Sequence, residues 1–139
     1  MKDHRPILLV EDDPVDIMTV KRALKDLKVT NDVISSRNGE EAIAYLNDPA
    51  NKFPIIILLD LNMPKMNGID FLKKAREMDL MGEAPIVVLT TSNEEQDMVE
   101  SYNLGIAGYM LKPLEYKKFV DVIHAIDVYW TLSELPLKD

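Results

Sequence analysis

Several features that would assign a protein to a particular class are missing from this sequence. It contains no cysteine, which excludes disulfide bonds, thiolate metal sites and cysteine nucleophiles. No apolar run approaches the ~18 residues that a membrane span requires. The first residues, 1–6, also lack the apolar stretch of a signal peptide. We therefore expect a cytoplasmic protein that does not work in a membrane.

Positive charge is also scarce. The 139 residues include 16 Lys and Arg against 24 Asp and Glu, which gives a net charge of −8. Binding to nucleic acid or anionic lipid needs clustered cations, so the acidic balance argues against both partners. The remaining composition, with 47% hydrophobic and 29% charged residues, is typical of one globular domain with a real core.

Short apolar runs alternate with helical patterns along the chain. The runs are continuous, as expected for strands buried on both faces, and they cover residues 7–10, 33–34, 55–59, 85–89 and 108–111. A helical pattern follows each run, with predicted starts at Pro14, after Asn38, near Ile69, at Ser92 and near Tyr116. Five such units predict an α/β domain with a parallel sheet and helices on both faces.

Two of these helix starts are predicted from capping residues. Asp13 precedes Pro14, which is the usual order of a helix cap and a first helical residue. Ser92 and Glu95 have the spacing of a capping box. This spacing predicts that the fourth helix begins at Ser92.

Chemically reactive residues follow the predicted strands. In open parallel sheets, ligands bind beyond the carboxyl ends of the strands. The residues found there are carboxylates, hydroxyls and a lysine, namely Glu11, Asp12, Asp13, Asp60, Thr90, Thr91 and Lys112. Taken singly, each has a simpler explanation, and for Asp13 we prefer its role as a helix cap. Their occurrence at the same end of four strands favours a shared site.

The residue types at this edge predict a particular chemistry. Crowded carboxylates repel one another, so a cation is expected among them. Oxygen ligands without His or Cys suit a hard ion, and few protein ligands with room for water suit Mg²⁺. Asp60 would remain an ionised nucleophile, while Mg²⁺, the Lys112 ammonium and the Thr90 hydroxyl would each meet one phosphoryl oxygen. The pattern predicts phosphoryl transfer to Asp60.

Four stretches of the sequence together resemble the receiver domain of two-component response regulators. They are residues 9–13, 58–64 with 67–68, 88–91 and 108–113, and the resemblance extends over about residues 6–128. It implies a flavodoxin-like, doubly wound sheet of five parallel strands with five helices and the strand order 2-1-3-4-5. The chain, 1–139, would then be a single receiver domain, with residues 129–139 as an apolar C-terminal extension.

The resemblance also implies a role for each matching residue. Asp60 would be the phosphoacceptor, and Thr90 and Lys112 would hold the phosphoryl oxygens. The expected Mg²⁺ ligands are Asp12 as the principal carboxylate, Glu11 through bound water, Asp60, and the backbone carbonyl of Asn62. The Lys112–Pro113 peptide is a candidate for the cis form, against a baseline of ~5% for such bonds.

Tyr109 matches the switch aromatic of this family. In that scheme Thr90 moves toward the phosphoryl group and Tyr109 turns inward. The two positions of the Tyr109 ring would then report the phosphorylation to the surface of the domain. The alternative is that Tyr109 only packs against the fourth helix. Thr91 departs from the small residue that is frequent in the family, which would narrow access to Asp60.

The implied partner is a sensor histidine kinase or a phosphotransfer protein. Only about ten residues follow the last predicted helix, too few for a DNA-binding module, so we expect the protein to act through contacts with other proteins. Its apolar tail resembles single-domain regulators of bacterial phytochrome kinases, which implies a homodimer through the fourth and fifth helices and the tail. Alternatively, Trp130 and the tail cover the core of their own domain.

Two other functions fit parts of the pattern. A phosphatase of the haloacid-dehalogenase type also uses an Asp nucleophile with Mg²⁺, but it needs a second acid two residues later, where this chain has Asn62. A binding-only pseudo-receiver would lack Asp60, the acidic pair or Lys112, and all of these are present. We therefore expect a phosphoacceptor signalling protein rather than an enzyme with its own substrate.

Overall fold

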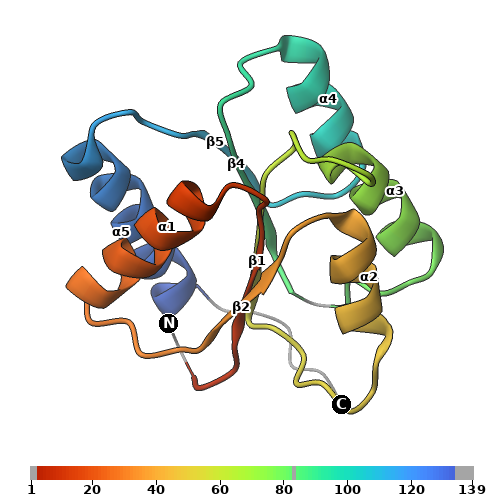
Figure 1. The fold of residues 1–139 in the computed structure, drawn as a ribbon, viewed down its shortest axis with the longest axis horizontal. Helices are drawn as coiled ribbons and strands as arrows, with labels where there is room; N and C mark the ends of the chain where they lie inside the picture. Colours follow the sequence, from red (N-terminus) through yellow and green to blue (C-terminus); the bar gives the residue numbers. More distant parts are fainter. Residues whose placement is uncertain (1–2, 83, 134–139) are drawn as a thin grey trace.

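The fold is an α/β domain built on a five-stranded parallel sheet (Figure 1). The computed structural model describes residues 3–82 and 84–133. The strands are β1 (Ile7–Val10), β2 (Val33–Ser36), β3 (Ile56–Leu59), β4 (Ile86–Thr90) and β5 (Gly108–Leu111), in the order β2-β1-β3-β4-β5. The predicted flavodoxin-like fold and strand order are therefore confirmed.

Five helices cover the two faces of the sheet. They are α1 (Pro14–Asp26), α2 (Gly39–Asn47), α3 (Gly68–Glu77), α4 (Glu95–Asn103) and α5 (Tyr116–Leu132). Helices α1 and α5 lie side by side on one face, and α2, α3 and α4 lie on the other (Figure 1). Strand side chains point alternately to the two layers, so that Ile7 and Leu9 pack toward α1 and α5 while Leu8 and Val10 pack toward α2 and α3.

The strand register brings the carboxyl ends of the central strands together. Val10 is aligned with Leu59, and Leu59 is aligned with Val88. The residues that follow these strands therefore leave the sheet side by side. Among them, Asp60 comes directly after the central strand β3, which has β1 on one side and β4 on the other.

The predicted helix starts are confirmed for α1 and wrong for α4. The Asp13 side chain accepts a hydrogen bond from Val15 N at 2.8 Å, and Pro14 is the first helical residue. In contrast, α4 begins at Glu95; the Ser92 hydroxyl donates to Asp97 Oδ2 at 2.6 Å and accepts from Glu94 N at 3.4 Å, before the helix starts. Glu94, which precedes α4, makes no capping bond with its side chain.

Gly68 allows α3 to begin directly against the loop that carries Asp60. A Cβ atom at Gly68 would lie 2.5 Å from the Asp60 carbonyl oxygen and 2.7 Å from Leu61 Cα. Both atoms belong to the backbone, so any larger residue at position 68 would displace the backbone of the loop that carries Asp60. Gly68 N also donates to Leu61 O at 3.0 Å, which fixes the loop after β3 against the helix.

The last helix continues to Leu132, beyond the predicted core limit at residue 128. Trp130 is buried in the layer formed by α1, α5 and the sheet, as expected if it covers its own domain. The predicted extension is described only as far as Ser133, because residues 134–139 lie outside the described residues. Within the described part of the chain, no helix has both the length and the apolar character needed to cross a membrane.

Candidate phosphoryl-transfer and metal site

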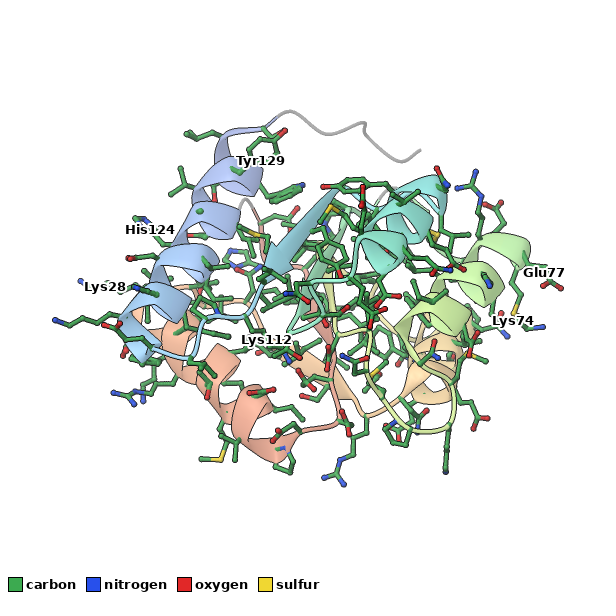
Figure 2. The ribbon with its side chains drawn as sticks, turned by 90° about the horizontal axis from the view of Figure 1, so that it is seen from above. Lys28, Lys74, Glu77, Lys112, His124 and Tyr129 are labelled. Atoms are coloured by element: carbon green, nitrogen blue, oxygen red, sulfur yellow. The ribbon has the colours of Figure 1, made fainter. Side chains whose placement is uncertain are left out.

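The residues predicted from the strand ends meet at one edge of the sheet. Figure 2 shows Lys112 near the middle of the molecule, whereas Lys28, Lys74, Glu77, His124 and Tyr129 lie at its periphery. The Lys112 side chain is only 7% exposed. Its ammonium group reaches the carboxylates that follow β1 and β3, so the first and last strands of the chain contribute to one site.

Three carboxylates form a cluster with the dimensions of a metal site. Glu11, Asp12 and Asp60 each offer one oxygen, and these oxygens lie within 4.8 Å of one another. Glu11 and Asp60 are buried, so their negative charges are poorly solvated and favour a bound cation. Since every ligand is an oxygen, the cluster fits a hard divalent cation such as Mg²⁺.

Backbone amides hold two of these carboxylates in place. Glu11 Oε2 accepts from the amides of Asp12 and Asp13 at 3.1 and 3.2 Å. Asp60 Oδ1 accepts from Asn62 N at 3.4 Å, so the loop after β3 curls around the side chain of Asp60. Asp13 serves as the cap of α1, in agreement with the simpler of its two explanations.

Lys112 pairs with three carboxylates. Its Nζ atom donates to Glu11 Oε1 and, at 2.9 Å, to Asp16 Oδ2, and it lies 3.5 Å from Asp60 Oδ2. Burial alone would lower the pKa of Lys112, but the hydrogen bonds to Glu11 and Asp16 outweigh it and hold the pKa above its usual value. Lys112 therefore stays charged and available to an anionic group on Asp60.

Burial raises the pKa of Glu11, whereas it acts to lower the pKa of Lys112. Desolvation raises the pKa of Glu11 from its usual 4.5 to about 7, because the Lys112 hydrogen bond offsets only part of the burial and the Asp60 charge opposes ionisation. The Glu11 side chain is 2% exposed. A second cation beside this carboxylate would relieve the cost of its charge.

Thr90 and Tyr109 are linked through the backbone of one residue. The buried Thr90 Oγ1 accepts from Ser92 N at 3.2 Å, and Tyr109 Oη donates to Ser92 O at 2.8 Å. Burial raises the pKa of Tyr109. A displacement of the Thr90 hydroxyl would therefore disturb the same residue that holds Tyr109. Thr91 is exposed and lies beside Lys112 in the lining of a surface hollow.

Three details differ from the sequence prediction or were absent from it. The Lys112–Pro113 peptide is trans, as are all the other peptide bonds of the described residues, so the proposed cis form was wrong. Asp16 and Ser92 were not predicted to belong to the site. Asp16 lies in the first turn of a helix rather than at a strand end, and Ser92 acts through its backbone, which its residue type does not reveal.

Comparison with known proteins agrees with the resemblance to receiver domains that the sequence indicates. Residues 7–124 match the family model described as the response regulator receiver domain. The chain is 34% identical to the response regulator Rcp1 of Synechocystis sp. over 128 residues, which cover 89% of this chain and 87% of Rcp1. Both proteins are therefore matched over most of their length.

Solved structures of similar proteins have the same fold. The phosphorylated cyanobacterial phytochrome response regulator RcpA has a TM-score of 0.88 and 34% identity, with 97% of this chain and 100% of RcpA covered. The Mn²⁺-bound form of Rcp1 has a TM-score of 0.84 and 34% identity, with 96% and 99% covered. With its fold, its acidic cluster and its matched residues in agreement, the chain belongs to the family of response regulator receiver domains.

Proposed function

We propose that this chain is a stand-alone response regulator that accepts a phosphoryl group on Asp60 from a sensor histidine kinase. The observation that carries the proposal is the position of the Lys112 ammonium, 3.5 Å from Asp60 Oδ2 beside the acidic cluster. A buried carboxylate with a cation held next to it can bind an anionic group that the carboxylate alone would repel. The localisation of the protein in the cytoplasm stays a prediction.

In the proposed reaction, an Asp60 carboxylate oxygen attacks the phosphorus atom of a phosphorylated imidazole. The new P–O bond forms as the P–N bond breaks, and the electron pair of that bond remains on the imidazole nitrogen. Lys112 would hold one phosphoryl oxygen, and Thr90 would turn its hydroxyl toward another. Glu11, Asp12, Asp60 and the Asn62 carbonyl would hold Mg²⁺, which supplies charge neutralisation at the phosphoryl oxygens when bound.

The test is phosphoryl incorporation from acetyl phosphate. The wild-type protein with Mg²⁺ should gain the mass of one phosphoryl group, as measured by intact-mass spectrometry. Asp60→Asn should gain none, and a chelator should abolish the gain in wild type. Asp70→Asn, a change of the same type on the exposed side of α3, is the matched control and should react like wild type. If wild type gains no phosphoryl group from acetyl phosphate or from a cognate kinase, the proposal is wrong.

Signalling would follow from a rearrangement around Tyr109. The hydrogen bonds of Thr90 and Tyr109 to the two sides of Ser92 support a coupled movement of the two residues. Tyr109→Ala should therefore leave the rate of phosphorylation intact while weakening the response of a partner-binding assay. If phosphorylation itself collapses in this variant, Tyr109 acts in the chemistry and its role as a switch is refuted.

A phytochrome-type histidine kinase is the proposed upstream partner, with a phosphotransfer protein as the alternative. The support is the similarity to RcpA and Rcp1, of which the first is described as a phytochrome response regulator. Transfer from a purified kinase of this type, compared with an unrelated kinase at equal concentration, tests this assignment. Equal rates from both kinases would contradict it.

We also propose a homodimer through α4, α5 and the C-terminal tail. Exposed apolar side chains on the two helices support it, namely Met98, Val99, Tyr102, Val128, Tyr129 and Leu132. Light scattering at several concentrations, with and without a phosphoryl analogue, should give the mass of a dimer. A monomeric mass in both states would contradict this part of the proposal. The division of the chain into one receiver domain with a short extension remains part of the same proposal.

An enzyme with its own phosphate-ester substrate is less well supported. The haloacid-dehalogenase mechanism needs an acid two residues after the nucleophile, and the amide of Asn62 cannot donate a proton as an acid does. A chain with this site would store the phosphoryl group rather than turn over a substrate. A binding-only function is also less well supported, because Asp60, Glu11 and Lys112 lie in direct contact.

A further inference from the structure

Lys112 has three N–H donors and three carboxylate neighbours. Two of these carboxylates have a second proposed role in the site, and one does not. Glu11 receives one hydrogen bond, but it also belongs to the acidic cluster that fits a divalent cation. Asp60 lies 3.5 Å away and is the proposed attachment point of the phosphoryl group. Asp16 receives the other hydrogen bond, at 2.9 Å, and is not part of the acidic cluster.

A bound divalent cation would weaken the contacts that hold the Lys112 ammonium group. A divalent cation at Glu11, Asp12 and Asp60 would attract the carboxylates that now hold Lys112 and would repel its ammonium group. Lysine has a flexible stem of four carbons, so its head group moves readily when its partners change. Lys112 and Asp16 both line an open hollow of about 330 Å³ between α1 and the loop after β5, so the ammonium group has room to move there and Asp16 is the carboxylate that it would meet.

We propose that Asp16 is a positioning residue that keeps the Lys112 ammonium directed at Asp60 when a divalent cation occupies the acidic cluster. This inference rests on the proposed function. Asp16 would not touch the phosphoryl group itself and would act only through Lys112.

The location of Asp16 suits this role. It lies in the first turn of α1, which Asp13 caps and whose buried residues fix it against the sheet and α5. Its backbone is therefore fixed by the packing of α1, while its side chain lies outside the acidic cluster. The Asp16 side chain is 32% exposed and still makes a direct ion pair with the buried end of Lys112.

The experiment measures the binding of beryllium trifluoride, a phosphoryl analogue, to the full chain at saturating Mg²⁺ by calorimetry. Asp16→Asn keeps the shape of the side chain and removes its charge, and it should weaken binding about threefold to tenfold, as expected for one partly exposed charged hydrogen bond. Lys112→Ala should weaken binding more. In the double variant, Asp16→Asn should cause no further loss, because its partner is already gone.

Asp70→Asn is the matched control. Asp70 occupies the same position in α3 as Asp16 in α1, the third residue of the helix, and it is exposed. Its replacement removes an equal charge near a helix N-terminus and should leave the affinity for beryllium trifluoride unchanged. The ¹⁹F spectrum of the bound analogue gives a second readout, and it should differ from wild type in Asp16→Asn but not in Asp70→Asn.

The possible results separate this inference from the proposed function. If wild type binds no beryllium trifluoride, both are refuted. If wild type binds and Asp16→Asn binds equally well or more tightly, only the role of Asp16 is refuted. That role is also refuted if Asp16→Asn weakens binding to the same extent with Lys112 present and absent. Thermal melting of each variant without Mg²⁺ identifies any loss that comes from unfolding.

Discussion

Helices α1 and α4 follow the two strands that flank β3, the strand that precedes Asp60, but they are held very differently. Helix α1 is capped by Asp13 and buries three apolar residues, Val20, Ala23 and Leu24. Helix α4 has no side-chain cap, and its one buried residue is Ser101, whose hydroxyl has no hydrogen-bond partner among the described residues.

Contacts with neighbouring helices also hold α1 more firmly than α4. The Arg22 guanidinium lies over the ring of Tyr116 in α5, 4.1 Å from its centroid, and Tyr116 Oη donates to Asp26 at 2.6 Å. Helix α4 has an ion pair from Glu100 to Lys73 of α3 at 3.0 Å, with both side chains partly exposed. Under the proposed phosphorylation, a new charge on Asp60 would meet a firm support on the α1 side, and the weakly held α4 is the element expected to move.

The largest expected effect comes from removing an apolar anchor of α1. Leu24→Ala should destabilise the protein by about 2–5 kcal/mol, because it leaves a cavity in a closely packed layer. Val99→Ala in α4 should cost less than about 0.5 kcal/mol, because the Val99 side chain is 52% exposed. Urea unfolding followed by circular dichroism measures both. Similar losses from the two variants would contradict the proposed difference between the helices.

The α1 side of the site also contains the residue that should titrate. Because the pKa of Glu11 is raised from 4.5 to about 7 by burial, the folded protein binds a proton there that the unfolded chain has released. This contribution to stability is complete below pH 4.5 and is lost as the pH rises through about 7. In a chelating buffer, the loss should be on the order of 3 kcal/mol.

Glu11→Gln provides the control for this pH dependence. Its side chain cannot ionise, so its unfolding free energy should lack this fall between about pH 5 and 7. Adding Mg²⁺ should restore stability to wild type at pH 7 but not to the variant. A wild-type protein whose metal-free stability rises over this range would show that Glu11 is already ionised at low pH.

The caps of the two helices offer a smaller test. Asp13→Ala removes the hydrogen bond to Val15 N and should cost about 1 kcal/mol. Glu94→Ala, at the equivalent position before α4, should have almost no effect, because Glu94 makes no capping bond with its side chain. Thermal melting is sufficient to compare them. An equal loss from both replacements would mean that α4 is capped in solution.

The smallest effect should be a gain in stability. Ser101→Ala removes a buried hydroxyl without a partner and should stabilise the protein by about 0.5–1 kcal/mol. Ser92→Ala, which removes a hydroxyl bonded to Asp97, should instead destabilise it slightly. Amide hydrogen exchange should slow in α4 of Ser101→Ala by more than in α1. If exchange in α4 does not slow, the unpaired hydroxyl is not what weakens the helix.

Most of the fold and the centre of the site could be predicted from the sequence. Residues 7–10 and 108–111 were placed correctly because short apolar runs flanked by polar residues have few other structural solutions. Glu11, Asp60 and Lys112 meet because parallel strands end at one edge, which requires no knowledge of side-chain packing. The rule that ligands bind beyond the carboxyl ends of parallel strands depends only on where each strand ends, and the reactive residues directly follow those ends.

Features that depend on the choice between side-chain partners could not be predicted. Ser92 has the spacing of a cap, but α4 begins three residues later, and the Ser92 hydroxyl bonds to Asp97 and to Glu94 N instead. Asp16 lies on a helix and reaches Lys112, which is 96 positions away, only after α1 has docked on the sheet. The burial of the Ser101 hydroxyl likewise depends on how α4 meets its neighbours.

Trp130 has a spectroscopic consequence. It is the one tryptophan of the sequence, and it is buried in the layer shared by α1 and α5 while also lining a hollow with Tyr109. Selective excitation of its indole ring would therefore isolate emission from a single known place. In denaturant, the emission would follow the loss of the firmly packed half of the molecule. Under the proposed switch, a change of emission on phosphorylation would report Tyr109 turning in the hollow that the two rings share, without any added label.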